Sequence, residues 1–346
     1  MIRIESIMGV GSHLLAGALF LLMFSHPTAQ TAWAANCDSV AGCIPQLRFG
    51  ETRSLRELAA QTLGERGDRF AIPPLVVTLE NDPGEFVRLK AAEALGRLGG
   101  QQVVKPLVQA MEKDPSELVR ETAAAALGRV GLSEGSAPLR QSLGGDPEWK
   151  VRLSAARAIG QMKGEEGSAA ALSNSLINDA RREVRIGAAH ALGRLKSNAG
   201  AAALVSAMAG DPVVPVRKAV AMALAASPGE ESEKALVKAL REDRDRSVRQ
   251  IVVTALGARG KESAALALIS SLQGDPAIEV RQEAAAALGQ IGGKDARSAL
   301  DYYAENSLFN PIRRAARDAL EDFVTKAPAS EKTTGPSSGV SPAASN

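Results

Sequence analysis

The sequence has few of the residues from which catalytic and metal sites are built. It contains three histidines and two cysteines among 346 residues, and His13 and His26 lie in an N-terminal segment that we do not assign to the fold. His190 is expected to face solvent. One imidazole and two thiols do not complete a zinc site, and no phosphate-binding loop, nucleophile elbow or thiol–histidine pairing is present. We therefore expect no catalytic residue, no metal and no cofactor.

Aromatic residues and an excess of either charge are also lacking. Aromatics make up 3% of the chain although 45% of it is hydrophobic, so a core must be built from Ala, Leu, Val and Ile with closely packed elements. The 41 Lys and Arg nearly balance the 39 Asp and Glu. A dedicated nucleic-acid binder usually has a clear basic excess, so this balance argues against one.

The one long apolar run lies near the N-terminus. Residues 14–24 are uncharged and apolar, which is too short for a membrane-spanning helix of about 20 residues. The small-residue pattern Ala-Trp-Ala follows at 32–34. This order is typical of a secretory signal peptide over residues 1–35, cleaved after Ala34 or Ala35. We expect a periplasmic or secreted protein without a stable membrane span, the alternative being an uncleaved anchor.

Both cysteines, Cys37 and Cys43, lie just after this segment. In an oxidising compartment they are expected to form a disulfide, and two free thiols are the alternative. Lipidation of Cys37 is disfavoured because Asn36 occupies the place of the small residue that precedes a lipidated cysteine.

The dominant feature is an internal repeat marked by an arginine. A Val, Leu or Ile precedes this arginine, an Ala or Val follows three residues later, and a Leu or Ile follows seven residues later. This spacing predicts one face of a helix, and a Leu thirteen residues before the arginine marks a second helix. The period is 32 residues with one interval of 33. The arginines are Arg56, Arg88, Arg120, Arg152, Arg185, Arg217, Arg249, Arg281 and Arg313.

An aspartate stands six residues before most of these arginines. A catalytic group would appear once, so the repeated Asp and Arg predict a structural ladder of charge-assisted hydrogen bonds between the turns. Pro follows five of the aspartates, which suggests N-cap and N1 positions, with Glu85 and Glu117 completing capping boxes. The aspartates are Asp82, Asp114, Asp146, Asp179, Asp211, Asp243 and Asp275.

Glycines recur at two places near the end of the second helix. One series, eight residues after the arginine, is expected to allow close approach of neighbouring helices, because a helical glycine otherwise costs about 1 kcal/mol relative to Ala. A later series is expected to end the helix in a left-handed conformation: Gly99, Gly131, Gly260 and Gly292.

The order Pro-Leu in the first helix, then Asp, then Val-Arg-x-x-Ala-x-x-Ala-Leu resembles the HEAT repeat. Its short Gly-rich form is similar to the HEAT-like repeats of phycobilin lyases. The resemblance covers residues 51–325 and implies an all-α, right-handed α-solenoid of about nine stacked helix pairs. It implies little about function, because this fold serves many tasks. HEAT-type enzymes with two irons use repeated His–Glu pairs, which a single histidine does not supply.

The two ends depart from the pattern. Residues 36–50, with Cys43 where other repeats have Leu, suggest an N-terminal cap with a truncated first helix tied by the disulfide. Residues 326–346 are rich in Ser, Pro, Gly and Ala and predict a disordered tail. The aromatic residues of the last repeat are expected to seal the C-terminal end: Tyr302, Tyr303, Phe309 and Phe323.

The exposed face of the second helix of each repeat is the candidate binding surface. In the first half it is expected to be basic, and in the second half weakly apolar. The candidate binding residues are Lys90, Arg97, Arg129, Trp149, Arg157 and Arg194. The weakly apolar positions are Met222, Ala226, Thr254, Ala258, Ala286 and Gln290.

These observations favour a non-enzymatic, extracytoplasmic scaffold that acts as a monomer and binds a protein partner through this surface. Two alternatives remain open. One is a lyase-like or cofactor-handling protein, by analogy with phycobilin lyases. The other is nucleic-acid binding through the basic row of arginines, although the balanced charge favours no nucleic-acid partner.

Overall fold

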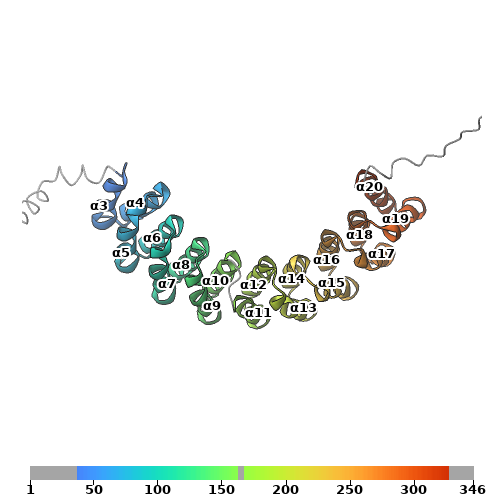
Figure 1. Ribbon diagram of the computed structural model, residues 1–346, viewed down its shortest axis with the longest axis horizontal. Helices are drawn as coiled ribbons and strands as arrows, with labels where there is room; N and C mark the ends of the chain where they lie inside the picture. The colour runs from blue at the N-terminus through green and yellow to red at the C-terminus, as the bar shows by residue number, and fades with distance from the viewer. Residues whose placement is uncertain (1–36, 163–166, 327–346) are drawn as a thin grey trace, which may run out of the picture. The chain divides into compact units, whose positions relative to one another are not determined.

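The computed structural model describes residues 37–162 and 167–326, and all regular structure in these ranges is helical (Figure 1). The chain divides into two compact units, Met1–Ala171 and Leu172–Asn346, with the boundary inside α11 (Ser168–Asn178). The expected signal peptide, residues 1–35, and the expected tail, residues 326–346 apart from Lys326, lie outside the described residues.

Each repeat consists of two helices, which we call helix A and helix B. The A helices are α3 (Val40–Phe49), α5 (Ile72–Asn81), α7 (Val104–Lys113), α9 (Ser136–Gly145), α11, α13 (Ala201–Gly210), α15 (Glu230–Glu242), α17 (Ala265–Gly274) and α19 (Lys294–Asn306). The B helices are α4 (Arg53–Arg66), α6 (Glu85–Leu98), α8 (Glu117–Val130), α10 (Trp149–Gln161), α12 (Arg182–Leu195), α14 (Val214–Ala226), α16 (Arg246–Arg259), α18 (Ile278–Ile291) and α20 (Asn310–Lys326).

Short 3-10 turns lead into five of the A helices. They are η1 (Arg69–Ala71), η2 (Gln101–Val103), η3 (Ser133–Gly135), η4 (Asn198–Gly200) and η5 (Glu262–Ala264).

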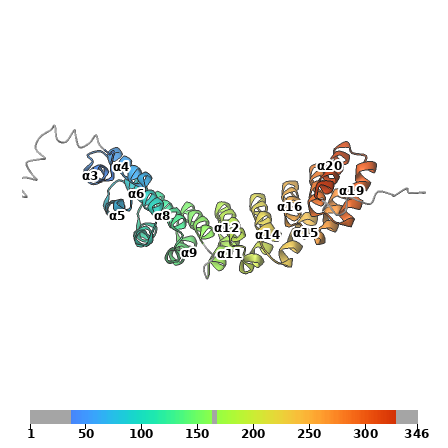
Figure 2. The ribbon, with the colours of Figure 1, turned by 45° about the horizontal axis from the view of Figure 1, so that its top comes forward.

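Within each unit the A helices form one layer and the B helices a second layer (Figures 1 and 2). Neighbouring B helices contact each other more extensively than neighbouring A helices do. The B layer is therefore the tighter side of each unit, taken by itself. The apolar positions predicted from the repeat form the core between the layers, where Val87, Leu95 and Leu107 are fully buried.

The tight B layer depends on contacts between glycine and alanine. A side chain added at Gly128 would place its Cβ 2.7 Å from Cα and Cβ of Ala158 on the next B helix. The same contact recurs between Gly64 and Ala94, again at 2.7 Å. These glycines therefore allow a helix approach that a methyl group would obstruct, as the sequence predicted.

The arginine–aspartate ladder joins consecutive repeats. Arg88 donates from Nε to Oδ2 of Asp114 at 2.8 Å and from Nη2 to Oδ1 at 2.9 Å, while its Nη1 donates to the carbonyl of Asp82 at 2.9 Å. The carboxylate thus comes from the next repeat, and the carbonyl from the arginine's own repeat. The pairs within the two units are Arg56–Asp82, Arg88–Asp114, Arg120–Asp146, Arg185–Asp211, Arg217–Asp243 and Arg249–Asp275.

These ion pairs are largely shielded from water. In the Arg249–Asp275 pair the side chains are 9% and 4% exposed. The hydrogen bonds that Arg249 donates to Asp275 raise the pKa of Arg249 above its ordinary value, and burial partly opposes that increase. The same cause raises the pKa of Arg88, so these guanidinium groups stay charged. An ion pair of this kind is costly to break because one charge then remains buried.

The aspartates do not cap the B helices as the sequence suggested. Asp114 is the C-cap of α7, and its Oδ1 accepts from the backbone N–H of Ser116 at 2.9 Å. Ser116 is the N-cap of α8, so Pro115 lies before the helix and not at its first position. The predicted capping boxes are also wrong: Ser116 makes no side-chain cap, and its hydroxyl donates to Glu85 of the preceding repeat at 2.7 Å. Glu117 is instead the first residue of α8.

Of the glycines expected to end B helices, Gly131 and Gly260 adopt the left-handed conformation, with φ of 68° and 64°. Gly99 and Gly292 also have positive φ but extended ψ.

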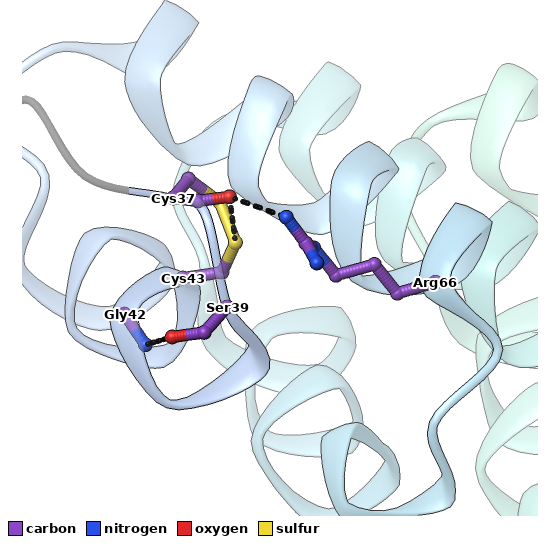
Figure 3. The surroundings of a disulfide bond; sticks show 5 residues. All are labelled: Cys37, Ser39, Gly42, Cys43 and Arg66. Atoms are coloured by element: carbon purple, nitrogen blue, oxygen red, sulfur yellow. Dashed lines mark hydrogen bonds between the residues drawn. A yellow bond between two sulfur atoms is a disulfide. The ribbon is translucent and has the colours of Figure 1, made fainter.

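The first repeat is closed by the disulfide Cys37–Cys43 (Figure 3). Cys43 is fully buried at the position that other repeats fill with Leu, and Nη2 of Arg66 donates to the carbonyl of Cys37 at 3.1 Å. The expectation of a truncated first helix was wrong, because α3 has 10 residues, as α5 does. The residues predicted as a separate cap therefore form the A helix of the first pair.

At the other end the aromatic residues do not seal the last repeat. Tyr302 is 60% exposed and Phe309 is 49% exposed. Tyr303 and Phe323 are half-buried. The seal fails because Tyr302 lies on the outer face of α19 and Phe309 in the turn before α20. Among the described residues, no helix is long and apolar enough to cross a membrane.

The glycine contact predicts opposite effects for two Gly-to-Ala substitutions. Gly128→Ala should lower the free energy of unfolding by about 1–3 kcal/mol because of overpacking against Ala158. Gly144→Ala in α9 should raise it by up to about 1 kcal/mol, since nothing lies within 4 Å of the added Cβ. Urea unfolding followed by circular dichroism measures both. Equal effects of the two substitutions would contradict the role of close approach.

The ladder predicts a larger loss of stability than an exposed ion pair. Asp146→Asn should lower the free energy of unfolding by about 1–3 kcal/mol, because the shielded charge of Arg120 then lacks its carboxylate. Asp318→Asn is the control, because Asp318 is 68% exposed and lies 3.9 Å from Arg314. Its effect should stay within about 0.5 kcal/mol. If both variants unfold at the same urea concentration, the ladder does not stabilise the stack.

Candidate functional site

The part of the chain that the structure describes holds no group of three or more His, Cys, Asp or Glu close enough to bind a metal ion. A hollow of about 390 Å³ lies between α13 and α15, lined in part by Met208, Lys238 and Glu242. The ladder residues Asp211 and Arg217 border this hollow, but their polar atoms are already used in hydrogen bonds.

The B-helix face, which we define as the exposed side of the B helices, carries the predicted binding residues. Arg97 on α6, Arg129 on α8 and Arg157 on α10 are exposed and belong to one unit. Arg194 on α12 is exposed but belongs to the other unit. The helical register of the repeat therefore predicted correctly that these arginine side chains are exposed. It did not predict which charged side chains lie next to them.

Acidic side chains from neighbouring repeats lie among these bases. Nη1 of Arg97 is 3.9 Å from Oε1 of Glu65 on α4. Nζ of Lys150 on α10 is 3.7 Å from Oε1 of Glu117 on α8. Both contacts join consecutive B helices across the face. These carboxylates partly neutralise the arginine row that the sequence predicted to be basic.

Two further acids complete this pattern. Nζ of Lys90 contacts Oε2 of Glu93 at 3.0 Å on the same helix. Burial raises the pKa of Glu121, and the nearby positive charges of Lys150 and Arg157 oppose that increase. The B-helix face of this unit is therefore a surface of alternating charge. Glu93 follows from the register of its helix, whereas the pairing of Glu65 and Glu117 with bases of the next repeat depends on how the B helices stack.

The candidate aromatic residue Trp149, the first residue of α10, is half-buried and not freely exposed. Phe86, at the start of α6, is also half-buried, and the guanidinium carbon of Arg53 on α4 lies 4.2 Å from the centroid of its ring. This cation–π contact accounts for the position of Phe86.

In the second unit the predicted weakly apolar positions of the B-helix face are exposed. Met222 on α14 is 57% exposed, and His190 on α12 is exposed as predicted. The other members of this row are also exposed: Ala226, Thr254, Ala258, Ala286 and Gln290. Charged side chains also lie on the B helices of this unit: Arg194 is exposed, and Nη1 of Arg246 on α16 is 3.6 Å from Oε1 of Glu279 on α18.

Comparison of the sequence with models of known protein families finds a match to HEAT repeats. The model for HEAT repeats matches residues 40–128, 104–176, 136–225, 169–245 and 233–321. The sequence matches no curated protein at significant similarity. These matches cover most of the chain and begin within α3, the A helix of the first pair.

Solved structures with a similar fold share little sequence with the chain. A structure of Kap95p with RanGDP is 13% identical over 92% of this chain and 50% of that chain, with a TM-score of 0.59. The Escherichia coli protein YibA is 21% identical over 75% of this chain and 95% of that chain, with a TM-score of 0.50.

The phycocyanin lyase complex of CpcE and CpcF from Nostoc sp. PCC7120 is 22% identical over 82% of this chain and 94% of that chain, with a TM-score of 0.35. Identities this low indicate nothing about activity. The family match and the stacked helix pairs, together with the fold shared with Kap95p, confirm the predicted architecture: the chain belongs to the HEAT-repeat family.

Proposed function

We propose that this protein is a non-enzymatic scaffold outside the cytoplasm and binds a protein partner through the B-helix face. The observation that carries this proposal is the alternation of charge on that face in the first unit. Arg97 lies beside Glu65, and Lys150 beside Glu117. A surface of this kind complements a partner that itself carries both charges.

The same alternation argues against a nucleic-acid ligand. Binding to a phosphate backbone depends on positive charges that replace counterions, and acids within the groove repel that backbone. Glu65 and Glu117 lie within ion-pair distance of the candidate bases, and Glu121 lies near Arg157. A protein surface, with both types of charge, does not suffer this repulsion.

The construction of the B layer supports a binding role. The glycine–alanine contacts and the ladder hold consecutive B helices at fixed spacing. Side chains on such a support lose little freedom when a partner binds, which lowers the entropic cost of association.

The disulfide supports the location outside the cytoplasm. Cys37 and Cys43 are joined, and such bonds persist in oxidising compartments. Residues 1–35, which the sequence predicts to be a signal peptide, are consistent with export.

A cross-linking experiment tests the protein-binding role. A photoreactive amino acid replaces Arg157 on the B-helix face, and in a control replaces Gln141, which is exposed on α9 of the opposite layer. In the native cell envelope, we expect one protein adduct from position 157 and none from position 141. The same adducts from both positions, or none from position 157, would reject the B-helix face as the binding surface.

Heparin chromatography separates this proposal from nucleic-acid binding. A variant with Ala in place of Arg97, Arg129 and Arg157 is compared with one lacking three exposed bases elsewhere in the same unit, Arg69, Lys105 and Lys113. Both should elute at the same salt concentration. Elution of the first variant at clearly lower salt would show that the arginine row binds polyanions.

The export proposal has its own measurement. Mass spectrometry of the native protein should find an N-terminus at Ala35 or Asn36 and a disulfide between Cys37 and Cys43. Deletion of residues 2–35 should leave the chain in the cytoplasm with reduced thiols. Cytoplasmic recovery of the full-length, uncleaved chain would contradict export without affecting the binding proposal.

A further inference from the structure

The hydrogen bonds of each ladder arginine divide into two sets. One is internal to the repeat: Nη1 donates to the carbonyl six residues earlier, as from Arg217 to Asp211 at 2.9 Å. The other set comes from the next repeat, whose aspartate accepts from Nε and Nη2. For Arg217 these distances to Asp243 are 2.7 and 3.0 Å. The first set orients the guanidinium, and the second binds a carboxylate in a fixed geometry.

In the last repeat, the arginine keeps the hydrogen bond to a carbonyl of its own repeat but lacks the hydrogen bonds to a carboxylate. Nη1 of Arg313 donates to the carbonyl of Ser307 at 2.6 Å, as in the preceding repeats. Within the described residues, no carboxylate lies within ion-pair distance of Arg313, because no repeat follows α20 there. Arg313 therefore keeps the carbonyl contact that orients the ladder guanidinium groups, while its Nε and Nη2 make no hydrogen bond to any described residue.

The preceding arginine also lacks a carboxylate partner. Ser307 stands where the other repeats have Asp, so Arg281 has no acid to pair with in the described part of the chain. Its Nε donates to the carbonyl of Leu272 at 2.9 Å, and its guanidinium carbon lies 5.1 Å from the centroid of the Phe309 ring. Two consecutive ladder arginines thus leave a positive charge beside one turn.

This turn also carries apolar side chains that the others lack. Leu308 is 92% exposed, and Phe309 is 49% exposed. No preceding turn has a leucine or an aromatic residue at these two positions. The corresponding residues are Pro83-Gly84, Pro115-Ser116, Pro147-Glu148, Ala180-Arg181, Pro212-Val213, Arg244-Asp245 and Pro276-Ala277. An exposed leucine beside unpaired arginines is costly in water and typical of an interaction surface.

We propose that this terminal turn, Ser307–Phe309 with Arg281 and Arg313, is a docking site for an acidic, apolar segment of a partner protein. An Asp or Glu of that segment accepts hydrogen bonds from Nε and Nη2 of Arg313, as the aspartate of a following repeat would. An apolar side chain of the same segment covers Leu308. The charge of the arginines selects the carboxylate, and the exposed leucine and phenylalanine supply the apolar contact.

A second copy of the chain does not fit this site. Consecutive stacking of two copies would place the first repeat of one against Arg313 of the other. That first repeat has Gly50 at the aspartate position, and its contribution to the ladder is only the Gly50 carbonyl, which accepts from Arg56 at 2.9 Å. The aspartate position of the first repeat therefore supplies no carboxylate in the ladder geometry, and a following copy would not reproduce the pair. We assign the site to a different protein.

The terminal turn is separate from the B-helix face. It lies at the edge of the stack where the A and B helices are joined, and the ladder continues along that edge. The proposal therefore adds a second contact surface and does not depend on whether the B-helix face binds a partner.

Fluorescence anisotropy tests the site with a defined probe. The probe is a labelled synthetic peptide with the sequence of residues 268–281, which contains the ladder aspartate Asp275 next to apolar residues. The matched probe carries Asn at that position. The full mature chain should bind the Asp peptide roughly tenfold more tightly than the Asn peptide, because one charge-assisted pair is lost. Binding should weaken as salt rises.

Protein variants locate the binding. Arg313→Gln and Leu308→Ser should each weaken binding of the Asp peptide about tenfold, whereas Arg314→Gln, which removes an 86% exposed charge next to Arg313, should not. Circular dichroism and the urea midpoint show that each variant is folded, and Arg313→Lys, which keeps the charge without the bidentate geometry, should bind with intermediate affinity. Equal binding of the two peptides, an equal effect of Arg314→Gln, or no binding at millimolar peptide would overturn the proposal.

A chain that ends at Lys326 excludes an internal occupant. It should bind the Asp peptide as the full chain does. If only the shortened chain binds, residues 327–346 occupy the turn in the full protein, and the inference of a partner is wrong.

Discussion

The contact between a glycine on one B helix and an alanine on the next sets the spacing on which the other features depend. Because the Cβ of Ala158 lies where a side chain at Gly128 would lie, the two helices approach until one backbone meets the methyl group of the other. A glycine in a helix costs about 1 kcal/mol, and the gain is a shorter distance between helices. That distance brings the aspartate of each turn within hydrogen-bond reach of the preceding arginine.

This constraint also explains why a chain with 3% aromatics packs a stable stack. Large side chains would separate the B helices and break the ladder. Repeat six shows a tolerated departure, since Ala225 stands at the glycine position there. Nη1 of Arg259, in repeat seven, donates to the carbonyls of Leu224 and Ser227 of repeat six at 2.8 and 2.6 Å, and so joins the end of α14 to the next B helix, α16.

The periodicity of the sequence predicted the helix pairs, the core positions and the close approach, because these depend on local register and residue size. It did not predict which residues pair. Asp114 is six residues from Arg120 in sequence but gives its carboxylate to Arg88, which lies 26 residues earlier. The pairing of each arginine with one of two aspartates depends on how consecutive repeats stack. The sequence period alone does not determine that stacking. For the same reason Asp114 was misassigned as the N-cap of a B helix, whereas it is the C-cap of the preceding A helix.

The sequence predicted where the candidate binding surface lies but not how its positive and negative charges are arranged. Exposure of Arg97 and Arg157 follows from the register of one helix, whereas the proximity of Glu65 to Arg97 depends on two helices and their separation. At the C-terminal end the predicted exposure was wrong. The aromatic residues were expected to cover the last repeat, but Tyr302 and Phe309 are exposed.

In the structure, the departures at that end fall on one turn. Ser307 replaces the acid, while Leu308 and Phe309 replace proline and small or polar residues. If the turn served only to end the stack, a polar residue and a paired charge would be favoured there, as on the surface of other capping repeats. An unpaired but oriented arginine beside an exposed leucine is instead the arrangement that a further acidic element would complete. The ladder geometry inside the stack therefore describes the ligand that the terminal turn accepts.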